Sequence, residues 1–199
     1  FELEQFRPWS GCYEKVYACK LATKIIQDCD AEYYVIKPIK ASRSNGVIMV
    51  RKENLDKKLK KILAIPKALS GETLGGLSSL TYDYWKFDNE DSFFVEEFVP
   101  SKIVEVSGKL YDPTARMVFI LTYDQGVVGV QFLKSFWKFS LKALDEQGSL
   151  IDKHISRYCQ DIANLSVEDI TINDQDLSLM QEQMVRAIVP FYVGTIVLG

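Results

Sequence analysis

A lysine followed by a loop of small residues is the feature of this sequence with the clearest chemistry. Lys37 closes a strand-like run, Pro38 follows it, and the stretch Ala41–Gly46 leads into a second apolar run. Small residues let backbone N–H groups approach a ligand closely, and such groups form concavities that bind anions. A lysine beside them adds a point charge. The stretch therefore predicts a phosphate site, and the alternative is a surface hairpin with solvated lysines. The loop residues assigned to this site are Ser42, Ser44 and Gly46.

The bulk composition is that of a globular protein. The chain has 199 residues, of which 47% are hydrophobic and 26% charged, and its net charge is −3. This balance does not predict a nucleic-acid partner. The sequence has no run of about 18 apolar residues, so it predicts no transmembrane helix and no membrane partner. The chain starts without Met, and we expect a trimmed chain or a fragment of a longer one.

The cysteines and the single histidine do not predict a metal site. Cys12, Cys19, Cys29 and Cys159 include no CxxC pair, so zinc is not expected. Cys12 and Cys19 are seven residues apart, which on a helix is one face, and buried thiols are favoured over a disulfide or a nucleophile. We expect a reduced, cytoplasmic protein. His154 is interpreted as structural or solvated, with a catalytic base as the alternative.

Hydrophobic periodicity predicts an α+β fold. Helices are expected at Phe6–Asp28, Asn54–Ala64 and Asp174–Val189, the last ended by Pro190. Strands are expected at Tyr33–Lys37, Val47–Val50, Ser92–Val99, Thr114–Tyr123, Val127–Phe132, Ser135–Leu141 and Thr195–Leu198. Strands joined by hairpins beside helices are typical of antiparallel sheets rather than of a doubly wound parallel sheet. An aromatic cluster at Tyr82, Tyr84, Trp85 and Phe87 is expected to pack under a loop, and the alternative is stacking on a ligand.

Three pieces of sequence, in this order, resemble the ATP-grasp family. They are Val35-Ile36-Lys37-Pro38 with its small-residue loop, Phe94–Pro100 with Glu105 shortly after, and Asp112 with Arg116 at the start of a long strand. The resemblance covers about Ala22 to Gly199. It implies two α+β subdomains of antiparallel sheet packed with helices, with ATP bound between them. The first would be residues 1–99, with the phosphate loop and a hinge strand, and the second residues 100–199.

The resemblance also implies a role for individual residues. Lys37 and Arg116 would supply cations to the phosphates, Arg116 as the catalytic residue. Arg116 lies in an apolar strand, where an unpaired charge would be costly to bury, so an anion is expected to meet it. Glu96, Glu97, Phe98 and Val99 would meet adenine through an edge strand, Glu105 would accept from the ribose, and Lys138 could face phosphate or substrate. The alternatives are an ordinary strand-end lysine at Lys37 and a solvent-facing pair at Glu96 and Glu97.

Active members of the family also bind Mg²⁺ through late acidic residues and a Glu-x-Asn motif. Here Thr195 stands where an acidic residue is common, and Gly199 is reached before any Glu-x-Asn. We therefore expect either a truncated chain or a degenerate member, with no metal ligand assigned within it. The loop at Ser42–Asn45 also carries Arg43 rather than several glycines.

Three functions are consistent with these residues. The first is the ATP-binding portion of a ligase that uses ATP and Mg²⁺ to convert a small-molecule or peptide carboxylate into an acylphosphate, which an amine then captures. The second is a non-catalytic interaction module that retains the fold. The third is a protein-kinase-like phosphotransferase, but the sequence has no H-R-D or D-F-G motif.

Overall fold

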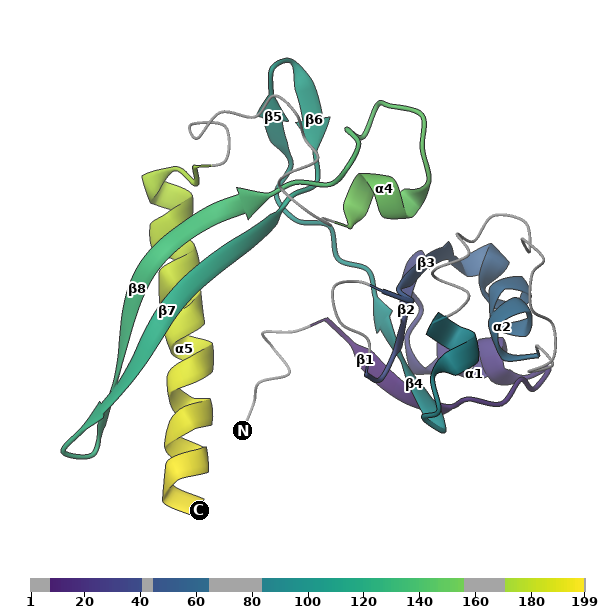
Figure 1. The fold of residues 1–199 in the computed structure, drawn as a ribbon, viewed down its shortest axis with the longest axis horizontal. Coiled ribbons are helices and arrows are strands. Elements are labelled where there is room, and N and C mark those ends of the chain that lie inside the picture. The colour runs from purple at the N-terminus through teal and green to yellow at the C-terminus, as the bar shows by residue number, and fades with distance from the viewer. Residues whose placement is uncertain (1–7, 41–44, 65–83, 156–170, 199) are drawn as a thin grey trace. The chain divides into compact units, whose positions relative to one another are not determined.

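The computed structural model describes residues 8–40, 45–64, 84–155 and 171–198. These residues fall into two compact units, one from Pro8 to Val99 and one from Pro100 onward. Both units combine helices with antiparallel strands (Figure 1), which confirms the α+β prediction. In the part of the chain described, no helix combines the length and apolar character needed to cross a bilayer.

A four-stranded antiparallel sheet with the strand order β1-β4-β2-β3 forms the centre of the N-terminal unit. Its elements are β1 (Ser10–Glu14), α1 (Leu21–Asp28), β2 (Tyr33–Pro38), β3 (Ile48–Arg51), the 3-10 turn η2 (Lys52–Asn54), α2 (Leu55–Leu63) and β4 (Ser92–Glu97). Strands β2, β3 and β4 and helix α2 confirm the corresponding predictions to within two residues. β-Branched and aromatic residues between turn-forming segments explain why these strands could be recognised.

Helices α1 and α2 cover one face of this sheet (Figure 1). Helix α2 buries Leu55, Leu59 and Ile62, which recur at helical spacing, and exposes Lys57 and Lys60 to solvent. These side chains join Ile25 of α1 and the inward-facing side chains of the sheet in one core. Among the residues described in this unit, no helix lies on the opposite face of the sheet.

The helix expected over Phe6–Asp28 is wrong in its first half. Residues 10–14 form β1, which pairs with β4 so that Cys12 lies opposite Phe94, and the helix begins only at Leu21. The alternation of side chains along β1 turns Tyr13 toward the core, where it is buried. Pairing with a strand some eighty residues later fixes this segment, and a local periodicity count does not register such a partner.

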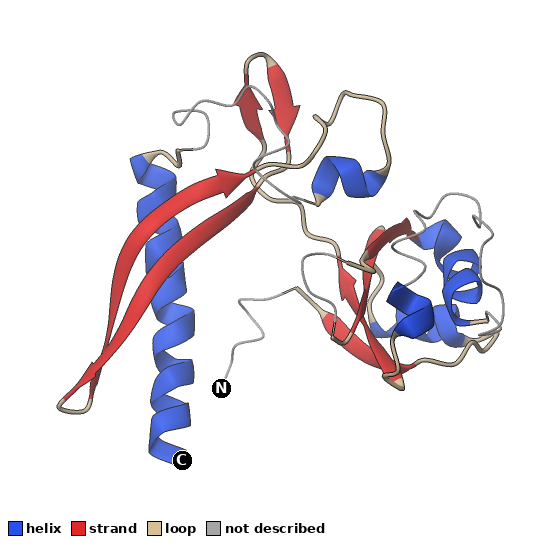
Figure 2. Ribbon diagram, in the orientation of Figure 1, coloured by secondary structure: helices blue, strands red, loops and turns tan. Residues whose placement is uncertain are grey.

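The C-terminal unit is built on a long two-stranded ribbon. Its elements are β5 (Val104–Val106), β6 (Lys109–Tyr111), β7 (Thr114–Asp124), β8 (Val127–Lys138), α4 (Leu150–His154) and α5 (Asp174–Leu198). Helix α5 runs alongside the β7–β8 ribbon (Figure 2). A core with buried Tyr111, Trp137 and Phe139 packs against side chains of α5, including Leu177.

Three expectations for the C-terminal unit need correction. The separate strand at Ser135–Leu141 is mainly the end of β8, which continues to Lys138. The last helix does not end at Pro190, and the strand at Thr195–Leu198 belongs to α5. Pro190 is exposed, so water can bond the carbonyl group that the proline leaves without an amide partner.

Candidate functional site

Lys37 lies on the sheet face that α1 and α2 leave uncovered. The register pairs Lys37 with Phe94 and Val35 with Glu96, and alternate residues of a strand share a face. Tyr34 and Ile36 point to the opposite face, where they are buried in the core. The face away from these helices therefore carries Val35, Lys37, Phe94, Glu96 and, opposite Val35 on β3, Met49. Val35 and Met49 are buried, so only Lys37, Phe94 and Glu96 among these are accessible.

The accessible part of this face combines the Phe94 ring with a close ion pair. The Lys37 ammonium pairs with the Glu96 carboxylate, and the two side chains are 36% and 31% exposed. They lie diagonally across β2 and β4, the arrangement in which long side chains reach one another. Phe94 is 37% exposed beside them. A half-exposed cation next to an aromatic ring can meet an anionic ligand that also has a flat apolar part.

Gly46 fixes the end of the loop that follows Lys37. Its φ of +73° is a backbone conformation that favours glycine, and a Cβ here would lie 2.7 Å from Pro38 Cγ. The Gly46 carbonyl accepts a 2.7 Å hydrogen bond from the indole N–H of Trp85. Gly46 is itself buried, so its role is to shape the loop. Ser42 and Ser44 lie outside the described residues.

Within the expected aromatic cluster, Trp85 is packed in the core. Its ring meets Phe93 edge-on, with centroids 5.8 Å apart, and it is 2% exposed. Phe87 is exposed, and Tyr82 lies outside the described residues.

The expected adenine edge at Glu96–Val99 is wrong for its first part, because β4 is an inner strand between β1 and β2. The Glu97 N–H donates to the Trp9 carbonyl at 3.1 Å, and the Phe98 N–H donates to the Tyr33 carbonyl at 3.0 Å. A backbone N–H group that already donates to a carbonyl within the fold is not available to adenine. Val99 lies beyond the strand and is exposed.

The Glu97 side chain serves the fold of the N-terminal unit. One of its carboxylate oxygens accepts from the Trp9 N–H at 3.0 Å, and the other contacts the Cys29 sulfur at 3.8 Å. Burial, followed by the Glu97 charge, raises the pKa of the Cys29 thiol. Cys29 is half-buried, but Cys12 and Cys19 are exposed free thiols, so the prediction of a buried helical pair is wrong. Cys159 lies outside the described residues.

In the C-terminal unit, Arg116 and Lys138 share one face of the β7–β8 ribbon. Thr114 pairs with Lys138 and Arg116 pairs with Phe136, which places the two cations at diagonal positions. Arg116 is exposed, so the expectation that burial forces an anion upon it is wrong. The alternation of β7 turns Arg116 away from the face that packs on α5. Glu105 lies on the separate β5–β6 hairpin, exposed and opposite Leu110.

Sequence reasoning missed a buried contact among Ser101, Asp112 and His154. The Asp112 carboxylate, 3% exposed, accepts from the Ser101 N–H at 2.8 Å and hydroxyl at 2.7 Å. Its other oxygen lies 2.8 Å from His154 Nδ1. A hydrolytic triad places histidine between serine and acid, whereas here the acid is in the middle. The contact therefore anchors the chain after β4 to α4, and no local sequence signal marks it.

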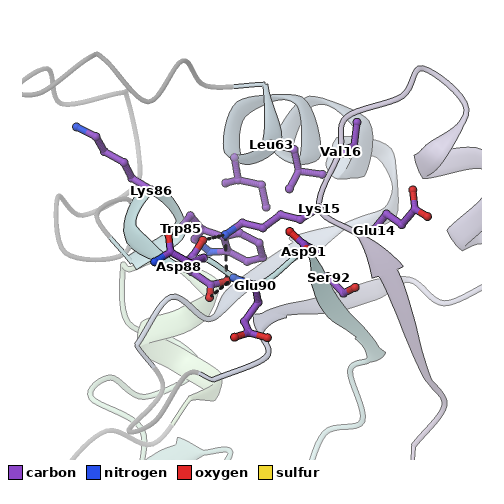
Figure 3. A pocket seen from close by; sticks show the side chains of 12 residues that line it. Glu14, Lys15, Val16, Leu63, Trp85, Lys86, Asp88, Glu90, Asp91 and Ser92 are labelled. Atoms are coloured by element: carbon purple, nitrogen blue, oxygen red, sulfur yellow. Dashed lines mark hydrogen bonds and ion pairs between the residues drawn. The ribbon is translucent and has the colours of Figure 1, made fainter.

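A separate cavity of about 550 Å³ lies beside Trp85 in the N-terminal unit (Figure 3). The Lys15 ammonium occupies part of its wall, donating to the Asp88 carbonyl at 2.6 Å and carboxylate at 3.0 Å. It also lies 5.7 Å from the Trp85 ring centroid. Because the Lys15–Asp88 pair is largely buried, with side chains 13% and 8% exposed, and the rim carries Glu14 and Asp91, this cavity is less suited to phosphate than the more exposed Lys37.

The residues described do not supply a magnesium site. Among them, no group of three or more His, Cys, Asp or Glu side chains is arranged to hold a metal ion. Each unit presents cations of the kind that phosphate groups require, namely Lys37 beside Phe94 in the N-terminal unit and Arg116 with Lys138 on the ribbon of the C-terminal unit. Comparison with protein-family models, curated proteins and solved structures finds no significant match to this chain.

Proposed function

We propose that the accessible surface around Lys37 and Phe94 on the N-terminal sheet binds the nucleotide ATP, with Lys37 as the residue that receives its phosphates. The observation that carries this proposal is the position of Lys37. It is an ammonium about one-third exposed at the end of β2, on the sheet face away from α1 and α2, with the exposed Phe94 beside it. A ligand there gains charge neutralisation from the lysine and apolar contact from its neighbours.

The wider proposal is that the chain is the ATP-binding part of a ligase that activates a carboxylate. Within the C-terminal unit, Arg116 and Lys138 lie together on the ribbon and are cations of the type that neutralise phosphate charge in such chemistry. Such catalysis consists of positioning and electrostatic stabilisation, and it requires no protein nucleophile. None of the residues described here is assigned a role in binding a metal ion.

Thermal unfolding with and without ATP tests nucleotide binding. A ligand that binds only the folded protein stabilises it by about 2.7 kcal/mol at a hundred times its dissociation constant. We expect a clear rise in Tm for the wild type and a much smaller rise for Lys37→Met, each relative to its own unliganded protein. Lys52→Met is the matched control, because Lys52 pairs with Asp30 in the same unit and its side chain is 41% exposed. An equal ATP response in the wild type and Lys37→Met would overturn the site.

A non-catalytic interaction module is the second candidate. The absence of a metal-holding group among the described residues favours it. The two candidates differ in turnover: a ligase fragment supplemented with Mg²⁺ and carboxylates should release phosphate or ADP, and Arg116→Gln should reduce that release. Arg186→Gln, which removes another exposed arginine from the same unit, is the control. A folded wild type that binds ATP without any turnover would favour the module.

A further inference from the structure

We infer that Glu96 is a built-in competitor for Lys37, so that a phosphate group binds this face only by displacing the Glu96 carboxylate. This inference rests on the proposed function and specifies how the same site controls its affinity. It differs from the role that the sequence resemblance gives Glu96, which is contact with the nucleoside.

Lys37 already has an anionic partner in the Glu96 carboxylate. Lys37 and Glu96 point to the same side of the sheet from adjacent strands, and the ammonium is bonded to one carboxylate oxygen. An incoming phosphate oxygen needs the donor protons that this carboxylate now accepts, and it also meets a like charge a few ångströms away. Phosphate binding and the ion pair are therefore mutually opposed.

Because Lys37 and Glu96 are both partly exposed, a phosphate group can replace the Glu96 carboxylate at Lys37. Both side chains are about one-third exposed, so solvent and ligand can reach the pair. Ion pairs with such exposure contribute little net stability, because water screens the attraction. Breaking the pair consequently costs little, and a multiply charged phosphate chain can outcompete one carboxylate where a weaker anion cannot.

The Glu97 side chain does not compete in this way. It belongs to the other face of β4 and is held by the Trp9 N–H and the Cys29 sulfur. Of the two adjacent glutamates, only Glu96 contacts the lysine in the structure. Glu96 therefore lies on the proposed ligand-binding face, whereas Glu97 contacts residues that hold the fold together.

The test uses Glu96→Gln, which keeps the size of the side chain and one acceptor oxygen but removes the charge. Isothermal titration calorimetry with three probes, namely inorganic tripolyphosphate, ATP and adenosine, separates the phosphate part from the nucleoside part. We expect tripolyphosphate and ATP to bind about threefold to tenfold more tightly to the variant, the range that removal of an exposed ion pair and a like charge allows. Adenosine affinity should not change.

Two controls test whether the tighter phosphate binding of Glu96→Gln comes from loss of the ion pair with Lys37. Glu53→Gln removes the same charge from the same unit, where Glu53 lies 3.9 Å from Arg51, and it should leave tripolyphosphate affinity nearly unchanged. In a Lys37→Met background, Glu96→Gln should give no tightening, because the competition requires the ammonium. High salt should reduce the difference between wild type and variant.

The outcomes separate this inference from the proposed function. If the wild type binds ATP and Glu96→Gln binds it equally or more weakly, the competitor role is overturned and nucleotide binding stands. Weaker adenosine binding by the variant would instead assign Glu96 to the nucleoside. If neither protein binds ATP or tripolyphosphate while both unfold cooperatively, the site and the inference are overturned together.

Discussion

The indole N–H of Trp85 donates a 2.7 Å hydrogen bond to the carbonyl oxygen of Gly46, 39 residues earlier in the chain. This contact ties the end of the loop after Lys37 to the short helical segment that precedes β4. Gly46 also packs so closely on Pro38 that no side chain fits between them. The anchoring of the candidate phosphate loop is therefore part of the core of the N-terminal unit.

Gly46→Ala should destabilise the protein more than an ordinary glycine substitution does. A positive φ costs an L-residue about 1–2 kcal/mol, and the new Cβ would also have to displace Pro38 from 2.7 Å. We expect a loss of about 2–3 kcal/mol in the free energy of unfolding, measured by urea titration. Gly126→Ala is the control, because it has a φ of +85° but no atom within 4 Å of its Cβ. Equal losses in the two variants would contradict a role for the Pro38 contact.

Asp112→Asn should weaken the C-terminal unit by about 2 kcal/mol, the scale of a lost hydrogen bond to a charged group. The amide still accepts from Ser101 but no longer offers a carboxylate oxygen to His154. Urea unfolding measures the loss, with the exposed Asp145→Asn as a control expected to change stability by less than about 0.5 kcal/mol. Combining Asp112→Asn with His154→Gln should cost less than the sum of the single changes. Additive losses would show that the two side chains act independently.

The sequence was informative where structure is determined locally. Strand β2 could be predicted because Tyr33–Ile36 is a compact apolar run before a turn-rich loop, and α2 because Leu55, Leu59 and Ile62 recur at helical spacing. Strand β1 could not, since its structure depends on pairing with β4. Helix α5 passes Pro190 although a local rule ends it there, because one lost amide bond does not outweigh the bonds on both sides.

The candidate site likewise combines features that a local sequence pattern reveals with features that depend on distant strands. Lys37 was identified by its type and its place at a strand end, which are local properties. Its pairing with Glu96 depends on the register between β2 and β4, 59 residues apart in sequence. The separation of Glu96 from Glu97 likewise requires the direction of β4 relative to the core. Sequence spacing alone does not distinguish the carboxylates of Glu96 and Glu97.

Cys29 should react with iodoacetamide more slowly than Cys12 or Cys19. Burial raises the pKa of the Cys29 thiol, the nearby Glu97 charge raises it further, and the thiolate is the reactive form. Peptide-level mass spectrometry after timed alkylation at pH 8 measures each site. Glu97→Gln, which keeps an acceptor for the Trp9 N–H, should accelerate alkylation at Cys29 and leave Cys12 unaffected. Faster labelling of Cys29 than of the exposed thiols would contradict the assignment.

Tyr13 should make the stability of the protein fall at alkaline pH. Burial raises the pKa of its phenol well above the ordinary value, and its hydrogen bond to the Asp28 carboxylate, 2.7 Å long, adds to the shift. The folded state therefore keeps this proton at pH values where the unfolded chain, with a tyrosine pKa of about 10, releases it. The stabilisation is complete below about pH 10 and declines by about 1.4 kcal/mol per pH unit above it.

Tyr13→Phe removes both the hydrogen bond and this titration. At pH 7 the variant should be less stable than the wild type by about 1 kcal/mol. The difference should shrink as pH rises from 9 to 11, because only the wild type loses the Tyr13 contribution. Tyr34, whose pKa burial also raises, titrates in both proteins and cancels in the comparison. Urea unfolding at intervals across this range measures the difference, and a gap that stays constant to pH 11 would show that the Asp28 contact does not hold the Tyr13 proton.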